Sequence, residues 1–128
     1  MKKETAHWPS YAYENIEVSR LLLSSGFFNP CLQNLQQAIE KTLKAAMIER
    51  EVGLRKSHSI QELSNILKAD GLDPKISKDE CELIDSIYIS SKYPVGSVLP
   101  DFEPDESICK DCMRIGERVY DSIAGAID

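Results

Sequence analysis

The 128-residue sequence predicts an all-α fold, and three observations lead to that prediction. Alternating apolar and polar residues, the pattern typical of strands, are scarce. Each long segment instead repeats its apolar residues at the spacing of a helix. Glycines and prolines separate these segments and mark helix ends, as at Gly26 and Gly71. A chain of this length suits one domain, residues 1–128, because it can bury about two-thirds of its unfolded surface without disulfides.

Five helices are expected, and most have a start signal in the sequence. Pro9 suits the first turn of the first helix, and Pro30, with Asn29 as N-cap, suits the start of the second. Two capping-box patterns, Ser59-x-x-Glu62 and Ser77-x-x-Glu80, precede the third and fourth. The first two expected helices are Pro9 to Ser25 and Pro30 to Glu51. The third is capped by Ser57, His58 or Ser59 and ends at Asp70, and the fourth runs from Ser77 to just before Tyr93-Pro94. A proline-rich loop from Lys92 to Pro104 precedes the last helix, Asp105 to Ile127.

The first helix has one polar residue on its predicted core face. That face consists of Tyr11, Ala12, Ile16, Val18, Leu22 and Leu23. Asn15 lies inside the same arc, where an unpaired amide would cost about 1–3 kcal/mol. Two interpretations of Asn15 stay open: a core amide with its hydrogen bonds satisfied, or a group that faces an internal polar site shared with the second helix.

The second helix carries a polar arc opposite its core face. The arc contains Gln33, Gln37, Glu40 and Lys44, with Gln36 and Lys41 at its edges, and the core face contains Leu32, Leu35, Ile39, Leu43 and Ala46. Most such arcs only meet water, and pairs such as Gln37–Lys41 and Glu40–Lys44 add a few tenths of a kcal/mol. Together with cations near helix ends, the arc also suits a phosphate or a carboxylate on a partner protein, and the sequence does not separate these. The added cationic groups are Arg55, Lys56, His58 and Lys92.

Composition excludes several classes of function. With 15 Lys and Arg against 21 Asp and Glu, the net charge of −6 argues against general nucleic-acid binding and against binding to anionic membranes. No apolar run approaches the roughly 20 residues that cross a bilayer, and no signal sequence is recognised, so a soluble, cytoplasmic protein is expected.

The cysteines and glycines offer no catalytic motif. Four scattered cysteines indicate reduced thiols, and Cys109-x-x-Cys112 lies on the core stripe of the last helix without two further zinc ligands. We therefore expect a packing role for this pair and no metal site. There is no glycine-rich phosphate loop and no cofactor motif.

Three motifs in order resemble the HEPN domain family. They are Gln36-Gln37-Ala38-x-Glu40-Lys41-x-Leu43-Lys44-Ala45, then Lys56-x-His58-x-Ile60-x-x-Leu63, then Tyr93-Pro94 ahead of a final long helix. The resemblance covers residues from about 8 to 124. It implies an up-and-down four-helix bundle with a fifth short helix, usually assembled as a homodimer. It also implies a prokaryotic protein that binds a nucleotide or pairs with a minimal nucleotidyltransferase in a toxin–antitoxin system.

The resemblance assigns a binding site and no catalytic residue. The nucleotide- or partner-binding residues it implies, together with the nearby Arg55, are Gln37, Glu40, Lys41, Lys44, Arg55, His58, Lys92 and Tyr93. Ribonuclease branches of the family place His four to six residues after Arg, whereas here two residues separate Arg55 from His58 and seven separate Arg50 from it. Enzymatic activity is therefore not expected. Two alternatives stay open: a toxin ribonuclease with an atypical site at Arg55 and His58, or a non-catalytic dimeric interaction module.

Overall fold

The computed structural model describes residues 7–53, 56–92 and 103–127, and only the backbone of 89–92 and 127. These residues form five helices and no strand, so the all-α prediction is confirmed. Within these ranges, none of the helices combines the length and the apolar character that crossing a bilayer requires. The helices are α1 (Trp8–Ser24), α2 (Phe28–Glu49), α3 (Ile60–Ala69), α4 (Lys78–Lys92) and α5 (Glu106–Ile127).

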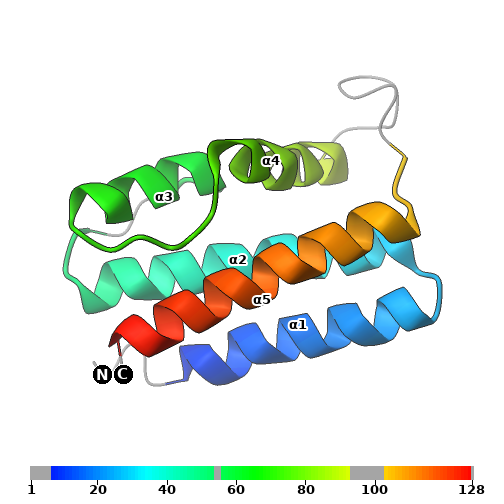
Figure 1. Ribbon diagram of the computed structural model, residues 1–128, viewed down its shortest axis with the longest axis horizontal. Helices are drawn as coiled ribbons and strands as arrows, with labels where there is room; N and C mark the ends of the chain where they lie inside the picture. The colour runs from blue at the N-terminus through cyan, green and yellow to red at the C-terminus, as the bar shows by residue number, and fades with distance from the viewer. Residues whose placement is uncertain (1–6, 54–55, 93–102, 128) are drawn as a thin grey trace.

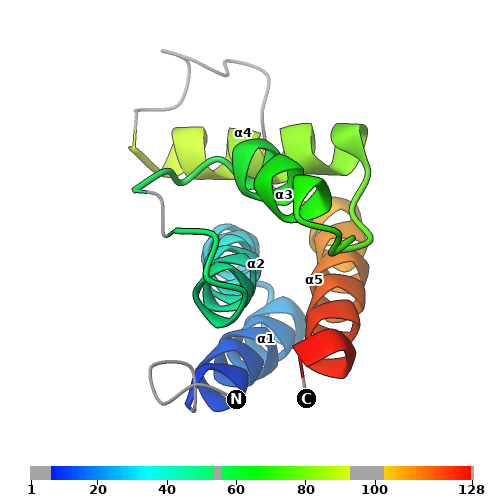
Figure 2. The ribbon, with the colours of Figure 1, turned by 90° about the vertical axis from the view of Figure 1, so that its left-hand side faces the viewer.

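Leaving the short α3 aside, the helices alternate in direction along the chain (Figure 1). α1 and α4 run one way and α2 and α5 the other, and α3, with ten residues, is the short fifth helix. Figure 2 shows α1, α2 and α5 nearly end-on, while α4 crosses them at a steep angle. α2 packs against each of the other four helices. Any site formed by residues of several helices is therefore expected to include residues of α2.

The core lies along the apolar face of α2. The five core residues predicted for this helix are each at most 1% exposed, which confirms the predicted face. α5 approaches closely at Gly116, where an added Cβ would lie 3.3 Å from Leu35 Cδ2. The core contribution of α5 includes Cys112, Ile115, Val119 and Ile123.

The capping predictions are confirmed for α3 and α4 and wrong for α2. Ser77 and Glu80 form the complete reciprocal box, with N···O distances of 2.9 and 3.1 Å. Ser59 Oγ accepts a hydrogen bond from the Glu62 backbone N–H at 3.2 Å. Asn29 was predicted to cap α2, but the helix already begins at Phe28. Phe28 packs against the core and starts the first turn there, and Pro30 still lies within that turn, where its missing N–H costs nothing.

The buried face of α1 is narrower than predicted. Tyr11 and Val18 were assigned to the core, but their exposed fractions are 57% and 43%. The face is instead centred on Ala12, Ile16 and Ser19, which are at most 2% exposed. Ser19 can be buried because its hydroxyl donates to the Asn15 carbonyl at 2.7 Å, so this small polar residue takes a place in the helix contact.

All four cysteines are free and buried. Burial raises the pKa of the Cys81 thiol to about 11, and those of Cys109 and Cys112 to about 12. Cys109 Sγ also lies 3.4 Å from the Phe28 carbonyl oxygen, to which it donates. These thiols act as small core side chains, as expected for Cys109 and Cys112.

The thiols should be unreactive until the protein unfolds. At about pH 8 the buried groups are almost wholly protonated, and the thiolate is the nucleophile. An aromatic disulfide reagent should therefore titrate almost no thiol in the native protein and four in guanidinium chloride. Rapid reaction of the native protein would contradict the burial of these side chains.

Candidate functional site

A cavity of about 340 Å³ lies where α2, the segment before α3, and α4 meet. Its volume is at the lower end of the range of roughly 300–1,000 Å³ for small-molecule sites. The lining combines amides, a carboxylate, an ammonium group and two aromatic rings. The residues are Gln33, Gln36, Gln37, Glu40, Lys41, His58 and Tyr88.

The Glu40 carboxylate is the most heavily hydrogen-bonded group of the cavity. It accepts hydrogen bonds from Gln36 Nε2 at 3.0 Å and Lys44 Nζ at 3.1 Å, and His58 Nδ1 lies 3.0 Å from Oε1. The side chain is only 16% exposed. Burial alone raises the pKa of Glu40, but the donors Gln36, His58 and Lys44 outweigh it and hold that pKa below its usual range. Glu40 is therefore ionised at neutral pH.

The ionised carboxylate determines how His58 is oriented. A carboxylate can only accept hydrogen bonds, so Nδ1 of His58 carries the proton of this contact. In the neutral ring, Nε2 is then the hydrogen-bond acceptor, and it points away from Glu40. The His58 side chain is 48% exposed, so a ligand can reach it.

Tyr88 and Asp85 of α4 hold the segment that carries His58. The Tyr88 ring stacks on the His58 ring with centroids 4.7 Å apart and an interplanar angle of 18°. Asp85 accepts the Ile60 backbone N–H at 2.6 Å and the Ser59 hydroxyl at 3.2 Å, which fixes the start of α3 beside His58. A second cavity, of about 370 Å³, lies on this side and is lined by His58, Ser59, Asp85 and Tyr88.

Asn15 connects α1 to the edge of the cavity. It is half-buried, and both atoms of its amide bond to α2. Its Nδ2 donates to Asn34 Oδ1 at 3.0 Å, and its Oδ1 accepts from Lys41 Nζ at 2.8 Å. Lys41 thus contacts Asn15 and not Gln37, its predicted partner. The amide of Asn15 is therefore satisfied, and both of its partners belong to α2, so the two interpretations of this residue stay open.

Five of the predicted binding residues come together at this place. Gln37, Glu40, Lys41 and His58 line the cavity, and Lys44 forms an ion pair with Glu40. Arg55, Tyr93 and the side chain of Lys92 lie outside the described residues.

Sequence reasoning missed two residues that shape the site. Neither Tyr88 nor Asp85 was singled out from the sequence as a site residue. Gln36, placed at the edge of the polar arc, is only 3% exposed. The helical period gives the direction of these side chains on their own helix, but it does not show which neighbouring element they meet.

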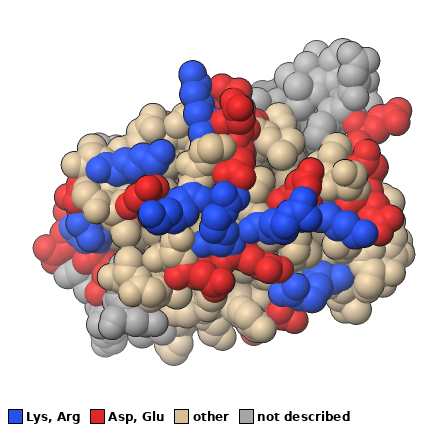
Figure 3. Space-filling model, in the orientation of Figure 1, with Lys and Arg blue, Asp and Glu red and all other residues tan. Residues whose placement is uncertain are grey.

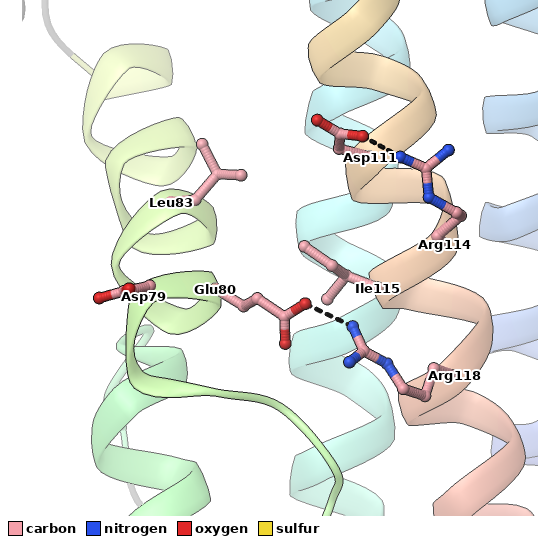
Figure 4. Close-up of a pocket in the computed structure, with 7 residues that line it drawn as sticks. All are labelled: Asp79, Glu80, Leu83, Asp111, Arg114, Ile115 and Arg118. Atoms are coloured by element: carbon pink, nitrogen blue, oxygen red, sulfur yellow. Dashed lines mark hydrogen bonds and ion pairs between the residues drawn. The ribbon is translucent and has the colours of Figure 1, made fainter.

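A larger cavity between α4 and α5 is less suited to a charged ligand. It has a volume of about 620 Å³, and Figure 4 shows Arg118 of α5 facing Glu80 of α4 across it, while Arg114 lies beside Asp111 on α5 itself. Arg118 donates to Glu80 at 2.6 Å, and Arg114 is paired with Asp111. On this side of the molecule, a belt of Lys and Arg is bordered by Asp and Glu (Figure 3). These cations are largely neutralised by carboxylates of the same chain.

Metal binding has no support in the described part of the chain. No three His, Cys, Asp or Glu side chains there lie close enough together to hold a metal ion. Glu40 contacts both His58 and the cationic Lys44, which is not a ligand set for a metal ion.

The comparisons with known proteins identify the family. The family model of the HEPN domain matches residues 5–125. The chain belongs to the HEPN domain family. Its fold is similar to the crystal structure of an archaeal HEPN homologue, with a TM-score of 0.65 over 100% of both chains and 19% sequence identity. That identity supports the shared fold alone. No match to a curated protein sequence was found.

Replacing Glu40 by Gln should remove a pH-dependent part of the stability. Because the folded-state pKa of Glu40 lies below the reference value of 4.5, its contribution is complete above about pH 4.5. That contribution is lost as the pH falls through the folded-state value. We expect Glu40→Gln to lower the free energy of unfolding by about 1 kcal/mol at pH 5.5, and by much less at pH 3. Urea unfolding at both pH values measures the difference.

Glu106→Gln is the matched control for this measurement. Glu106 pairs with Lys110 at 3.0 Å, but its side chain is 61% exposed. Its replacement should change the free energy of unfolding by less than about 0.5 kcal/mol at either pH. An equal loss for both variants would show that the environment of Glu40 is not special.

Proposed function

We propose that the cavity lined by α2, His58 and Tyr88 binds a nucleotide. The protein would act as a small HEPN protein that works with a minimal nucleotidyltransferase, as one half of a toxin–antitoxin pair. Membership in the HEPN family and the order of its motifs support the partner. The cavity itself supports the ligand.

The nucleotide assignment rests mainly on the hydrogen-bond partner of the Lys41 ammonium group. In the part of the chain that the structure describes, its ammonium group contacts the neutral oxygen of Asn15 and no carboxylate. The nearby Glu40 already has Lys44 as its ion-pair partner. Lys44 lies outside the lining but pairs with the lining carboxylate, so counting it there are two ammonium groups beside one carboxylate, a balance that favours an anion such as a phosphate.

The other lining groups suit the rest of a nucleotide. The stacked rings of His58 and Tyr88 form an aromatic wall on which a base can stack, an interaction that tolerates different bases. Gln33 and Gln37 also line the cavity and offer both amide donors and acceptors. We place the phosphate near Lys41 and the base near His58.

Calorimetric titration with ATP and GTP tests this assignment. Lys41→Ala should weaken binding at least tenfold, because it removes the cation that has no carboxylate partner. The control is Lys110→Ala, which removes an exposed lysine of α5 already paired with Glu106. It should leave binding unchanged. Absence of heat with millimolar ligand, or equal effects of both variants, would rule out the nucleotide site.

One observation favours a second function, that of a ribonuclease. The Glu40–His58 contact leaves Nε2 of His58 as a proton acceptor at the surface, an arrangement found in general acid–base catalysis. The motif spacing still departs from that of the ribonuclease branches. This function thus rests on His58 with Arg55, without the usual Arg–His pair.

A cleavage assay separates the two functions. If the protein is a ribonuclease, it should cleave single-stranded RNA without added metal, and His58→Ala should reduce the rate by at least 100-fold. Under the nucleotide-binding function, the wild type leaves RNA intact, while His58→Ala still weakens nucleotide binding. Cleavage that persists in His58→Ala would exclude this residue as the catalyst.

A further inference from the structure

α1 presents a second ordered set of apolar side chains, and this set faces solvent. Tyr11, Val18 and Leu21 are 57%, 43% and 66% exposed. They are separated by seven and three residues, the spacing of positions a, a and d in a heptad. Glu14 occupies the intervening d position. We call Tyr11, Glu14, Val18 and Leu21 the outer seam of α1.

The fold itself does not require the outer seam to be apolar. The inner face of α1 already packs against α2 and α5 through Ala12 and Ile16. Figures 1 and 2 both place α1 at the margin of the bundle. Every exposed large hydrophobic side chain in the described ranges lies between Tyr11 and Phe27. Tyr11, Val18 and Leu21 expose roughly 300 Å² of mostly apolar surface, the size of the largest apolar patch on a typical monomer, which is often functional.

We propose that the outer seam packs against the outer seam of a second copy of this chain, with the two α1 helices antiparallel. Heptad spacing is the pattern that packs one helix against another, and a symmetric pair needs no other partner. The seam supplies more than a third of the roughly 800 Å² per partner in a standard interface, and the flanking polar residues form its rim. This assignment deepens the expected homodimer by naming its surface.

The charge at Glu14 decides the orientation. In a parallel pair, each d position faces itself, so two Glu14 carboxylates would oppose each other at the contact. In an antiparallel pair with its two-fold axis near Ile16, Tyr11 lies opposite Leu21 of the second copy, and Glu14 lies opposite Val18. The two carboxylates are then apart, and the two most exposed apolar side chains of the outer seam meet.

The interface lies beside the cavity without forming it. Asn15, next to the seam in sequence, is the residue that holds Lys41 at the cavity edge. The inner wall of the cavity, with Glu40, His58 and Tyr88, comes from elements other than α1. Assembly and ligand binding are therefore measured separately, and either can fail alone.

Analytical ultracentrifugation of the full-length chain tests the interface. The wild type should sediment as a dimer at about 50 μM, and Val18→Asp and Leu21→Asp should each sediment as monomers. The control is Tyr13→Asp, the same kind of change on α1 outside the seam, at a side chain 49% exposed. It should remain dimeric. Circular dichroism checks that each variant is folded, which is expected because both seam positions face solvent.

Glu14→Leu tests the interface in the opposite direction, because this change should strengthen the dimer only if Glu14 lies in the contact. Replacing the charge in the seam by an apolar side chain should tighten the dimer at least tenfold, as measured by its dissociation constant. A monomeric wild type at 50 μM would overturn the proposal. Dimeric Val18→Asp, a monomeric Tyr13→Asp control, or no tightening by Glu14→Leu would do the same.

Discussion

A carboxylate that water cannot fully solvate must find its hydrogen-bond donors in the protein, and Glu40 is placed under that constraint on α2. Its donors come from Gln36 and Lys44 on the same helix and from His58 before α3. Satisfying Glu40 therefore draws the His58 segment onto the central helix. Tyr88 of α4 then completes the lining, and Asp85 of α4 fixes the start of α3 beside His58. The cavity follows from the need to satisfy one charge at the meeting point of three elements.

The same helix separates two kinds of surface. One face of α2 is apolar and holds the bundle together, and the opposite face carries the polar groups of the cavity. α1 also has two different faces: its inner face is buried in the core, and its outer seam is apolar and exposed. The proposed ligand site and the proposed contact surface thus lie on neighbouring helices, which the hydrogen bond between Asn15 and Lys41 joins. Neither surface weakens the core on which both depend.

Much of the fold was predictable because it depends on local signals. The 3.6-residue period located the core face of α2, and the capping boxes located the starts of α3 and α4. Misassignments arose where tertiary contacts decide. Tyr11 and Val18 are apolar but face outward, because α1 meets its neighbours over a narrower face than its composition suggests.

The candidate site was predictable in part for the same reason. The polar arc and the family motifs pointed to Glu40, Lys41 and His58. Their convergence with Tyr88, 30 residues beyond His58, depends on the crossing of α4 over α2, which no local pattern encodes. The helices can form from neighbouring residues, but the cavity joins groups distant in sequence, so it should be the last feature gained on refolding and the first lost on partial unfolding.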